Sequence, residues 1–233
     1  MQMTEDILGR VLFDFLKHEG DQSILVHTSY GADETYDMKY FFRDFEDMPD
    51  LEQYALSLCS GRILDIGAGA GSHALCLQQQ GHDVTAMDIS QGCVNVMAGR
   101  GLRKVLHLDI YNMQEGGYNT LLLLMNGIGI TGNLKGLVRF LDKAAEITSS
   151  RAQVIFDSTD VSYVINEKPG EKDGYPGEVE YQFEYLGDEG PWFEWLYVDQ
   201  EKLVQVCDRS AWLPQIVYEH NQGHYLARLL KKY

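Results

Sequence analysis

Three glycines at alternate positions, Gly67, Gly69 and Gly71, form the most informative feature of the sequence. They follow a short apolar run and precede a helical pattern, so the backbone of this turn can approach a ligand closely. Asp65 lies two residues before Gly67, and Asp88, at the end of the next apolar run, lies 21 residues after Gly67. A carboxylate at that second position can accept hydrogen bonds from both hydroxyls of a ribose. The combination predicts a site for a nucleotide or a nucleoside.

The spacing of the glycines distinguishes two kinds of site. The dinucleotide-binding fingerprint of nicotinamide oxidoreductases requires glycine at position 72, where this chain has Ser72. The carboxylate of Asp65 would repel a pyrophosphate, whereas it suits the ammonium group of an amino acid. The loop therefore favours a nucleoside, while an ordinary structural turn and a nicotinamide site stay open as alternatives.

From position 61 onward, short apolar runs alternate with helical patterns. This alternation is typical of β-α repeats that build a parallel sheet. The predicted strands lie at about 63–65, 84–88, 105–109, 118–125 and 154–157. A helix capped by Asn133 follows the fourth strand. After a helix over about 200–211, a hairpin at 215–219 and 225–230 ends the chain, so we expect an α/β fold with a doubly wound sheet.

Two acidic segments flank this core. We expect residues 1–60 to form an N-terminal helical cap, with helices after Thr4 and after Pro49, and we leave 36–45 unassigned. Residues 160–198 are predicted to form an inserted β-hairpin, because apolar and polar residues alternate over 179–185. We expect 20–50 and 160–198 to act as a lid over the ligand edge of the sheet, with 61–159 as the binding core and 199–233 as its end.

The inserted segment is rich in aromatic residues, which could form a cage for a cationic or aromatic acceptor or could simply be strand formers. They are Tyr163, Tyr175, Tyr181, Phe183, Tyr185, Trp192, Phe193, Trp195 and Tyr197.

The charge and cysteine patterns exclude several classes of function. The net charge is −16, with −9 in residues 1–60, −9 in 160–200 and +2 in the remainder, which argues against nucleic acid as a partner. The longest apolar run, about 119–130, is too short for a membrane helix, and the acidic N-terminus predicts a cytoplasmic protein without a secretory signal. No close cysteine pairs are present, so we expect free thiols and no metal site. The oligomeric state is left open.

The run Ile63–Gly71 resembles the first signature of class I S-adenosylmethionine-dependent methyltransferases, and Val84–Ser90 resembles the second. The stretches Tyr40–Pro49 and Met125–Gly129 resemble a small uncharacterised bacterial branch of that family. The resemblance covers about 61–159 and 200–230. It implies a Rossmann-like fold with a seven-stranded mixed sheet and S-adenosylmethionine as the cofactor.

The resemblance also implies which residues contact the methionine and ribose parts of the cofactor. The backbone of Gly67, Ala68 and Gly69 would border the methionine part. Asp65 would meet its amino group, and Asp88 would hold the ribose.

The remaining implied contacts concern the adenine and the sulfonium. Ile89 would pack on the adenine, Asp109 would accept from its amino group, and Ile110 would offer its backbone N–H. Met125 and Asn126 would line the site near the sulfonium.

Arg43 is a rare positive charge in an acidic segment. We hypothesise that it pairs with the carboxylate of the methionine part, while Tyr40 walls the methyl group. The alternative is an exposed ion pair with Asp44, Glu46 or Asp47, which would say nothing of function.

Methyl transfer from a sulfonium requires alignment and exclusion of water, and a general base only if the acceptor must lose a proton. His27, His73, Asp157 and Tyr40 are possible participants, but none has a motif that makes it catalytic. The Asn-Pro-Pro-Tyr motif of many amino-group methyltransferases is absent at 125–128, so nucleic-acid bases lose support as acceptors. We therefore predict methyl transfer to a small molecule. A nucleoside-binding protein without catalysis and an NAD(P)-dependent oxidoreductase are the alternatives.

Overall fold

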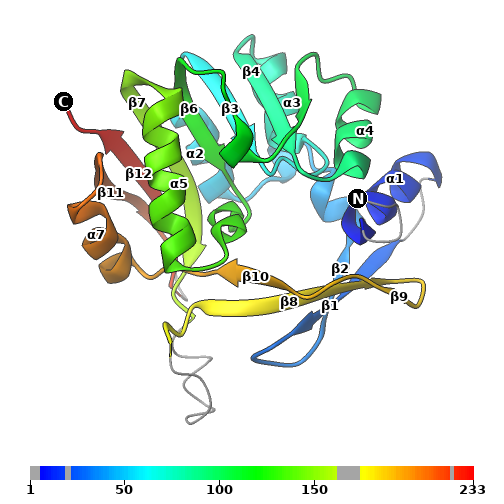
Figure 1. Ribbon diagram of the computed structural model, residues 1–233. Coiled ribbons are helices and arrows are strands. Elements are labelled where there is room, and N and C mark those ends of the chain that lie inside the picture. The colour runs from blue at the N-terminus through cyan, green and yellow to red at the C-terminus, as the bar shows by residue number, and fades with distance from the viewer. Residues whose placement is uncertain (1–5, 19–21, 162–173, 221–222) are drawn as a thin grey trace.

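The computed structural model describes residues 6–18, 22–161, 174–220 and 223–233. Its centre is a seven-stranded sheet in the order β11-β12-β7-β6-β3-β4-β5 (Figure 1). Its strands are β3 (Arg62–Ile66), β4 (Asp83–Asp88), β5 (Val105–His107), β6 (Tyr118–Leu123), β7 (Thr148–Thr159), β11 (Trp212–Glu219) and β12 (His224–Lys231). The first five run parallel, and β11 and β12 are antiparallel. The predicted doubly wound mixed sheet is confirmed.

Helices cover both faces of this sheet because its strands are apolar on both sides. Leu51, Leu77 and Met97 pack on one face, from α2 (Asp50–Leu58), α3 (Ser72–Gln79) and α4 (Gln91–Gly99). The other face is covered by α5 (Leu134–Ile147) and α7 (Gln200–Asp208). The predicted helix cap is confirmed, because the Asn133 side chain accepts a hydrogen bond from the Gly136 amide.

The order of the strands defines where a ligand can bind. From β3 the chain moves outward to β4 and β5, and then returns to β6 on the other side of β3. The carboxyl ends of β3 and β6 therefore form the switch point of the sheet, where helices leave in opposite directions and a crevice opens. The glycine turn follows β3, and Met125 and Asn126 follow β6.

A second sheet, sheet A, crosses the molecule below the first one in Figure 1. Its strands are β1 (Ser23–Thr28), β2 (Glu34–Asp37), β8 (Glu178–Tyr185), β9 (Asp188–Glu189) and β10 (Phe193–Leu196). The main path is β10-β8-β1-β2, with antiparallel pairs throughout. The predicted hairpin over 179–198 is present, but it pairs with the N-terminal strand β1.

The N-terminal segment differs in part from a purely helical cap. Its two predicted helices are present as α1 (Ile7–His18) and α2, but β1 and β2 lie between them. The aromatic stretch contains two short 3-10 helices, η1 (Met38–Phe41) and η2 (Phe45–Asp47). The predicted cap Thr4 and the aromatic residue Tyr163 lie outside the described residues.

Helix α1 is anchored on α4 by glycines. A Cβ at Gly92 would lie 2.5 Å from the carbonyl carbon of Gly9, so the two backbones touch. The Asp6 carboxylate accepts hydrogen bonds from the Gly92 amide and the Ser90 hydroxyl, both at 2.9 Å. The N-terminal segment is thereby fixed to the helix that begins directly after Asp88.

Candidate functional site at the carboxyl edge of the sheet

The glycine turn is shaped by three residues with positive φ, at 68° for Gly67, 57° for Gly69 and 81° for Gly71. Residues other than glycine rarely adopt these φ angles. The amides of Gly67 and Ala68 donate to the Met87 carbonyl at 2.9 and 3.0 Å, so these two hydrogen bonds fix the turn to β4. The loop therefore offers a ligand its shape and its open surface, while these two amides are used internally.

Asp65 is the buried acid of the site, with 2% of its surface exposed. Its Oδ2 atom has no hydrogen-bond partner among the described residues. Burial raises the pKa of Asp65 to about 6, with His73 opposing that shift. A buried, unpartnered carboxylate oxygen is costly on its own and fits a cationic ligand group such as an ammonium.

Asp88 closes the turn from the end of β4. Its Oδ2 accepts from the Gly69 amide at 3.0 Å and its Oδ1 from the Ser90 amide at 2.9 Å. Burial raises the pKa of this half-buried carboxyl group. The next side chain, Ile89, is 63% exposed, which leaves an apolar surface beside the carboxylate. A ribose and a flat base are ligands of this chemistry.

Asp109 and Ile110 lie at the neighbouring strand end, because His107 of β5 pairs with Asp88 of β4. Asp109 is exposed, and its carboxylate caps a short 3-10 helix by accepting from the Tyr111 amide at 2.9 Å. Ile110 is 5% exposed and anchors that turn in the core. The structure thus brings both predicted residues to the same edge as Asp88.

The chain leaves β6 through two consecutive left-handed residues, Met125 at φ 61° and Asn126 at φ 53°. Residues other than glycine rarely adopt this conformation, and backbone strain of this kind concentrates at functional sites. Asp157, which is 2% exposed, stabilises the turn because its two oxygens accept from the Asn126 amide at 3.1 and 2.9 Å. His224 contacts the same carboxylate at 2.9 Å through Nε2. No motif in the sequence predicted His224.

Arg43 lies in a buried ion-pair network. Its Nη2 donates to both oxygens of Glu52 at 2.8 Å, and His73 Nε2 lies 2.8 Å from the same carboxylate. The Arg43 guanidinium also stacks 3.9 Å from the ring of Tyr40, which is 47% exposed. The partner Glu52 was not predicted from the sequence. Arg43 Nε is buried without a partner among the described residues.

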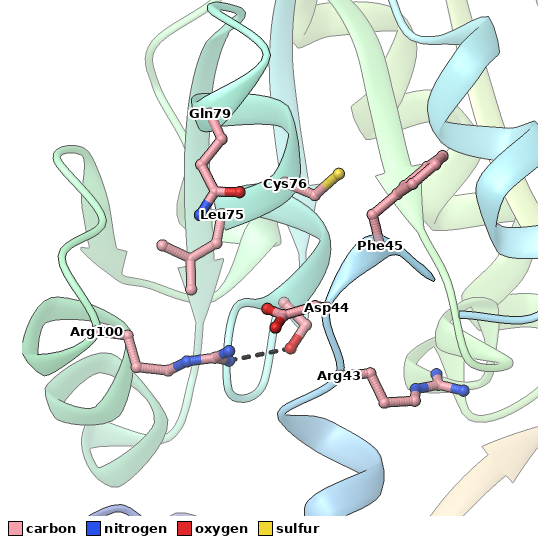
Figure 2. Close-up of a pocket in the computed structure, with 8 residues that line it drawn as sticks. Arg43, Asp44, Phe45, Leu75, Cys76, Gln79 and Arg100 are labelled. Carbon is pink, nitrogen blue, oxygen red and sulfur yellow. Dashed lines mark hydrogen bonds between the residues drawn. The ribbon is translucent and has the colours of Figure 1, made fainter. Parts of the chain in front are cut away.

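A cavity of about 250 Å³ lies beside α3 (Figure 2). Among the predicted cofactor residues only Arg43 lines it, and its guanidinium points away from Arg100 in the figure. Arg100 instead donates to the Ala70 carbonyl and the Ser72 hydroxyl at 2.7 and 3.0 Å. Because Asp65 and Asp88 lie elsewhere, we place the ligand site at the carboxyl edge and not in this cavity.

The other possible proton acceptors have structural partners. His27 belongs to sheet A and lies 3.0 Å from both Asp33 and Glu184. Its hydrogen bond to Glu184 raises the pKa of its ring, with Asp33 adding to that shift. The ligand atoms of His27, Glu184 and Glu189 also lie within 4.8 Å of one another. His27 pairs with Glu184, and Glu189 accepts from the side-chain amide of Gln182 at 3.4 Å. The four cysteines are buried free thiols, as predicted.

The whole chain is similar to a solved SAM-dependent methyltransferase from Bacteroides fragilis in complex with S-adenosyl-L-homocysteine. The two share 30% sequence identity and a TM-score of 0.91, over 100% of this chain and 98% of the other. The chain belongs to the S-adenosylmethionine-dependent methyltransferases. The predicted class I methyltransferase fold, enzyme class and cofactor are thereby confirmed.

More distant methyltransferases share the fold. CcbJ from Streptomyces caelestis matches with TM-score 0.67 and 10% identity over 98% of this chain and 99% of its own. The sugar N-methyltransferase KedS8 from Streptoalloteichus sp ATCC 53650 matches with TM-score 0.58 and 13% identity over 89% and 100%. Searches for a matching family profile and for a matching curated protein found none. Among the described residues, no helix is long and apolar enough to cross a membrane.

Proposed function

We propose that this methyltransferase transfers the methyl group of S-adenosylmethionine to a small-molecule acceptor in the cytoplasm. The observation that carries the proposal is a pair of buried atoms, Asp65 Oδ2 and Arg43 Nε, which have no hydrogen-bond partner within the part of the chain that the structure describes. Asp65 and Arg43 carry opposite charges. His73, in the first turn of α3, interacts electrostatically with Asp65 and shares the ion-pair partner Glu52 with Arg43. An amino acid in its zwitterionic form, such as the methionine part of the cofactor, carries the two groups that would complete them.

The other residues of the edge take roles that follow from their chemistry. Gly67, Ala68 and Gly69 border the methionine part by shape, since the amides of all three already donate to residues of β4. Asp88 accepts from the ribose hydroxyls with the lone pairs left beside its two backbone bonds. Exposed Ile89 covers the adenine.

At the far end of the adenine, Asp109 accepts from its amino group, and Ile110 presents its backbone N–H. Met125 and Asn126 line the place where the methyl group is transferred. Tyr40 walls that place from the N-terminal segment, stacked on Arg43.

Catalysis in this proposal is mainly alignment. The cofactor supplies the electrophile as a methyl group on a sulfonium, so the protein has to orient the acceptor in line and exclude water. The strained turn at Met125 and Asn126, fixed by Asp157, gives the edge a defined shape for that purpose. Sheet A lies over the same edge, where it can exclude solvent.

Three observations support a small-molecule acceptor. The net charge of −16 disfavours nucleic acid. Among the structural relatives, KedS8 is a sugar N-methyltransferase. Another relative, from Burkholderia thailandensis, is a 1,6-didemethyltoxoflavin-N1-methyltransferase with 16% identity to this chain.

Calorimetric titration with S-adenosylhomocysteine tests the cofactor site. We expect saturable binding to the wild-type protein and a loss of about tenfold or more for Asp88→Asn, because charge-assisted hydrogen bonds to the ribose contribute roughly 1.5 to 3 kcal/mol each. Asp83→Asn is the matched control, since Asp83 lies at the opposite end of the same strand and pairs with Lys104. It should leave the affinity unchanged.

Two further measurements separate the alternatives. Binding of NADH in place of S-adenosylhomocysteine would favour the oxidoreductase. A screen of small amines, phenols and alcohols for incorporation of labelled methyl groups distinguishes a methyltransferase from a nucleoside-binding protein that lacks catalysis. Equal affinities of the two aspartate variants would contradict the ribose assignment.

A further inference from the structure

One face of sheet A is directed toward the rest of the molecule. Ile24, Val26 and Val179 lie on this inner face and pack in a cluster with α1 and α4. In the strand register, Tyr36 pairs with Ile24, and Glu34 pairs with Val26. Directly paired residues of neighbouring strands point to the same side of a sheet, so Glu34 and Tyr36 also lie on the inner face.

Four tyrosines and one carboxylate gather on this face. We call Tyr30, Glu34, Tyr36, Tyr181 and Tyr197 the tyrosine cluster. The Tyr181 hydroxyl lies 2.8 Å from that of Tyr30 and 2.7 Å from that of Tyr197. The Tyr36 hydroxyl donates to Glu34 at 2.5 Å. Glu34 and Tyr36 remain exposed, with 41% of the Tyr36 surface accessible.

The members of the cluster influence one another electrostatically. Burial is the main cause that raises the pKa of Tyr30 and of Tyr197, and the negative charge of Glu34 adds to both shifts. These phenols therefore stay neutral at physiological pH. The cluster presents π faces and hydroxyl oxygens beside the carboxylate of Glu34, a combination that attracts cations.

The cluster lies close to the methyl-transfer edge. Strand β2 is followed directly by η1. At the end of η1, the Phe41 carbonyl accepts a hydrogen bond at 2.7 Å from the hydroxyl of Ser72, the first residue of α3 after the glycine turn. At the other end of sheet A, Trp195 packs so tightly on Gly129 that a Cβ there would lie 2.1 Å from the indole. Gly129 belongs to η4 (Gly127–Thr131), which begins directly after Asn126. Sheet A is thus tied to both ligand-binding turns.

We propose that the tyrosine cluster binds a small organic ammonium ion, and that the methyl acceptor therefore carries a cationic nitrogen. Aromatic faces attract ammonium groups through the ring quadrupole, and one carboxylate completes the pairing. The acceptor enters between sheet A and the carboxyl edge with its cation on Glu34 and Tyr36. This inference rests on the proposed function for its link to methyl transfer, whereas the binding of a cation can be measured separately.

The test uses two isosteric probes, choline and 3,3-dimethylbutan-1-ol, which differ by the replacement of the charged nitrogen with carbon. Each is titrated into the wild-type protein with and without saturating S-adenosylhomocysteine, and tryptophan fluorescence reports binding, since Trp195 lies 6.4 Å from Tyr181. We expect choline to bind about tenfold more tightly than the neutral alcohol. Glu34→Gln should remove most of that preference, and Tyr36→Leu should reduce it.

Glu180→Gln is the matched control. Glu180 lies on the same sheet but alternates with Val179 and Tyr181 along β8, so it belongs to the outer face. Glu180→Gln removes the same charge as Glu34→Gln, but it should leave the preference for choline intact. Equal binding of the two probes to the wild-type protein would overturn the proposal, and so would equal losses in the Glu34 and Glu180 variants. A preference for choline in a protein that does not bind S-adenosylhomocysteine would support the cation site and contradict the proposed function.

Discussion

At the scale of single residues, the site is costly to the fold. Asp65 is 2% exposed, one of its oxygens has no hydrogen-bond partner among the residues that the structure describes, and burial raises its pKa from 3.8 to about 6. Between these two values the folded protein binds a proton that the unfolded chain does not, so this group stabilises the fold less as the pH rises. Above pH 6 the carboxylate is ionised in the folded protein, which is the form that would hold an ammonium group.

Asp65→Asn should therefore separate stability from binding. We expect its free energy of unfolding at pH 7.5 to exceed that of the wild type by about 2 to 3 kcal/mol, since a shift of one pKa unit corresponds to about 1.4 kcal/mol. The difference should fall towards zero as the pH approaches 4. Affinity for S-adenosylhomocysteine should drop at pH 7.5. Urea denaturation at several pH values measures the first effect, and a pH-independent stability difference would contradict the explanation by burial of charge.

At the scale of elements, the turn after β6 depends on β7. Met125 and Asn126 are both left-handed, and the buried Asp157 carboxylate accepts from the Asn126 amide while it contacts His224 on β12. A single side chain thus joins three strands at the edge where the methyl group would be transferred.

Replacement of Asp157 by Ala should lower the free energy of unfolding by about 1 to 3 kcal/mol, because the half-buried amide of Asn126 loses its acceptor. The strained turn should also relax, which should weaken S-adenosylhomocysteine binding. Asp142→Ala, at an exposed position of α5, is the control and should change stability by less than about 0.5 kcal/mol. Chemical denaturation and calorimetry measure the two effects. Equal stability of the two variants would show that Asp157 does not hold the turn.

The core elements could be predicted from the sequence because buried parallel strands have a local signature. The runs before Asp65 and Asp88 are continuous and apolar, and a glycine turn or a helix follows each of them. Strand β2 lacks such a signature, since Glu34–Asp37 is polar and largely exposed. Strand β1 pairs with a segment about 150 residues away, and local patterns do not encode that partner.

The candidate site was predictable to a similar extent. The loop and Asp88 follow from spacing, but Glu52 and His224 do not, because each acquires its role from a partner brought close by the fold. Arg43 was expected either to bind the cofactor or to form an exposed ion pair. Its partner Glu52 is instead buried, at 6% exposed, and the contact to the cofactor stays a prediction.

At the scale of the whole molecule, the two sheets should differ in local stability. The central sheet is covered on both faces by large apolar clusters, whereas sheet A has exposed edge strands and rests on α1 and η4. We expect faster amide hydrogen exchange in peptides from 23–37 and 178–196 than in β3 and β6, and slower exchange in the former on S-adenosylhomocysteine binding. Mass spectrometry of exchanged peptides measures both. Uniform exchange across the two sheets would contradict this prediction.

The order of the sheet A strands along the chain also has a consequence during synthesis. Strand β1 emerges from the ribosome early, yet its partner β8 begins at Glu178. At about 5 to 20 residues per second, β1 waits roughly 8 to 30 s for that strand. Throughout this interval the nascent chain exposes the apolar side chains of Ile24 and Val26, which are 1% and 5% exposed in the folded protein. Sheet A therefore cannot form until most of the chain has been synthesised, and a chaperone that shields the emerging N-terminal hairpin would raise the yield of folded enzyme.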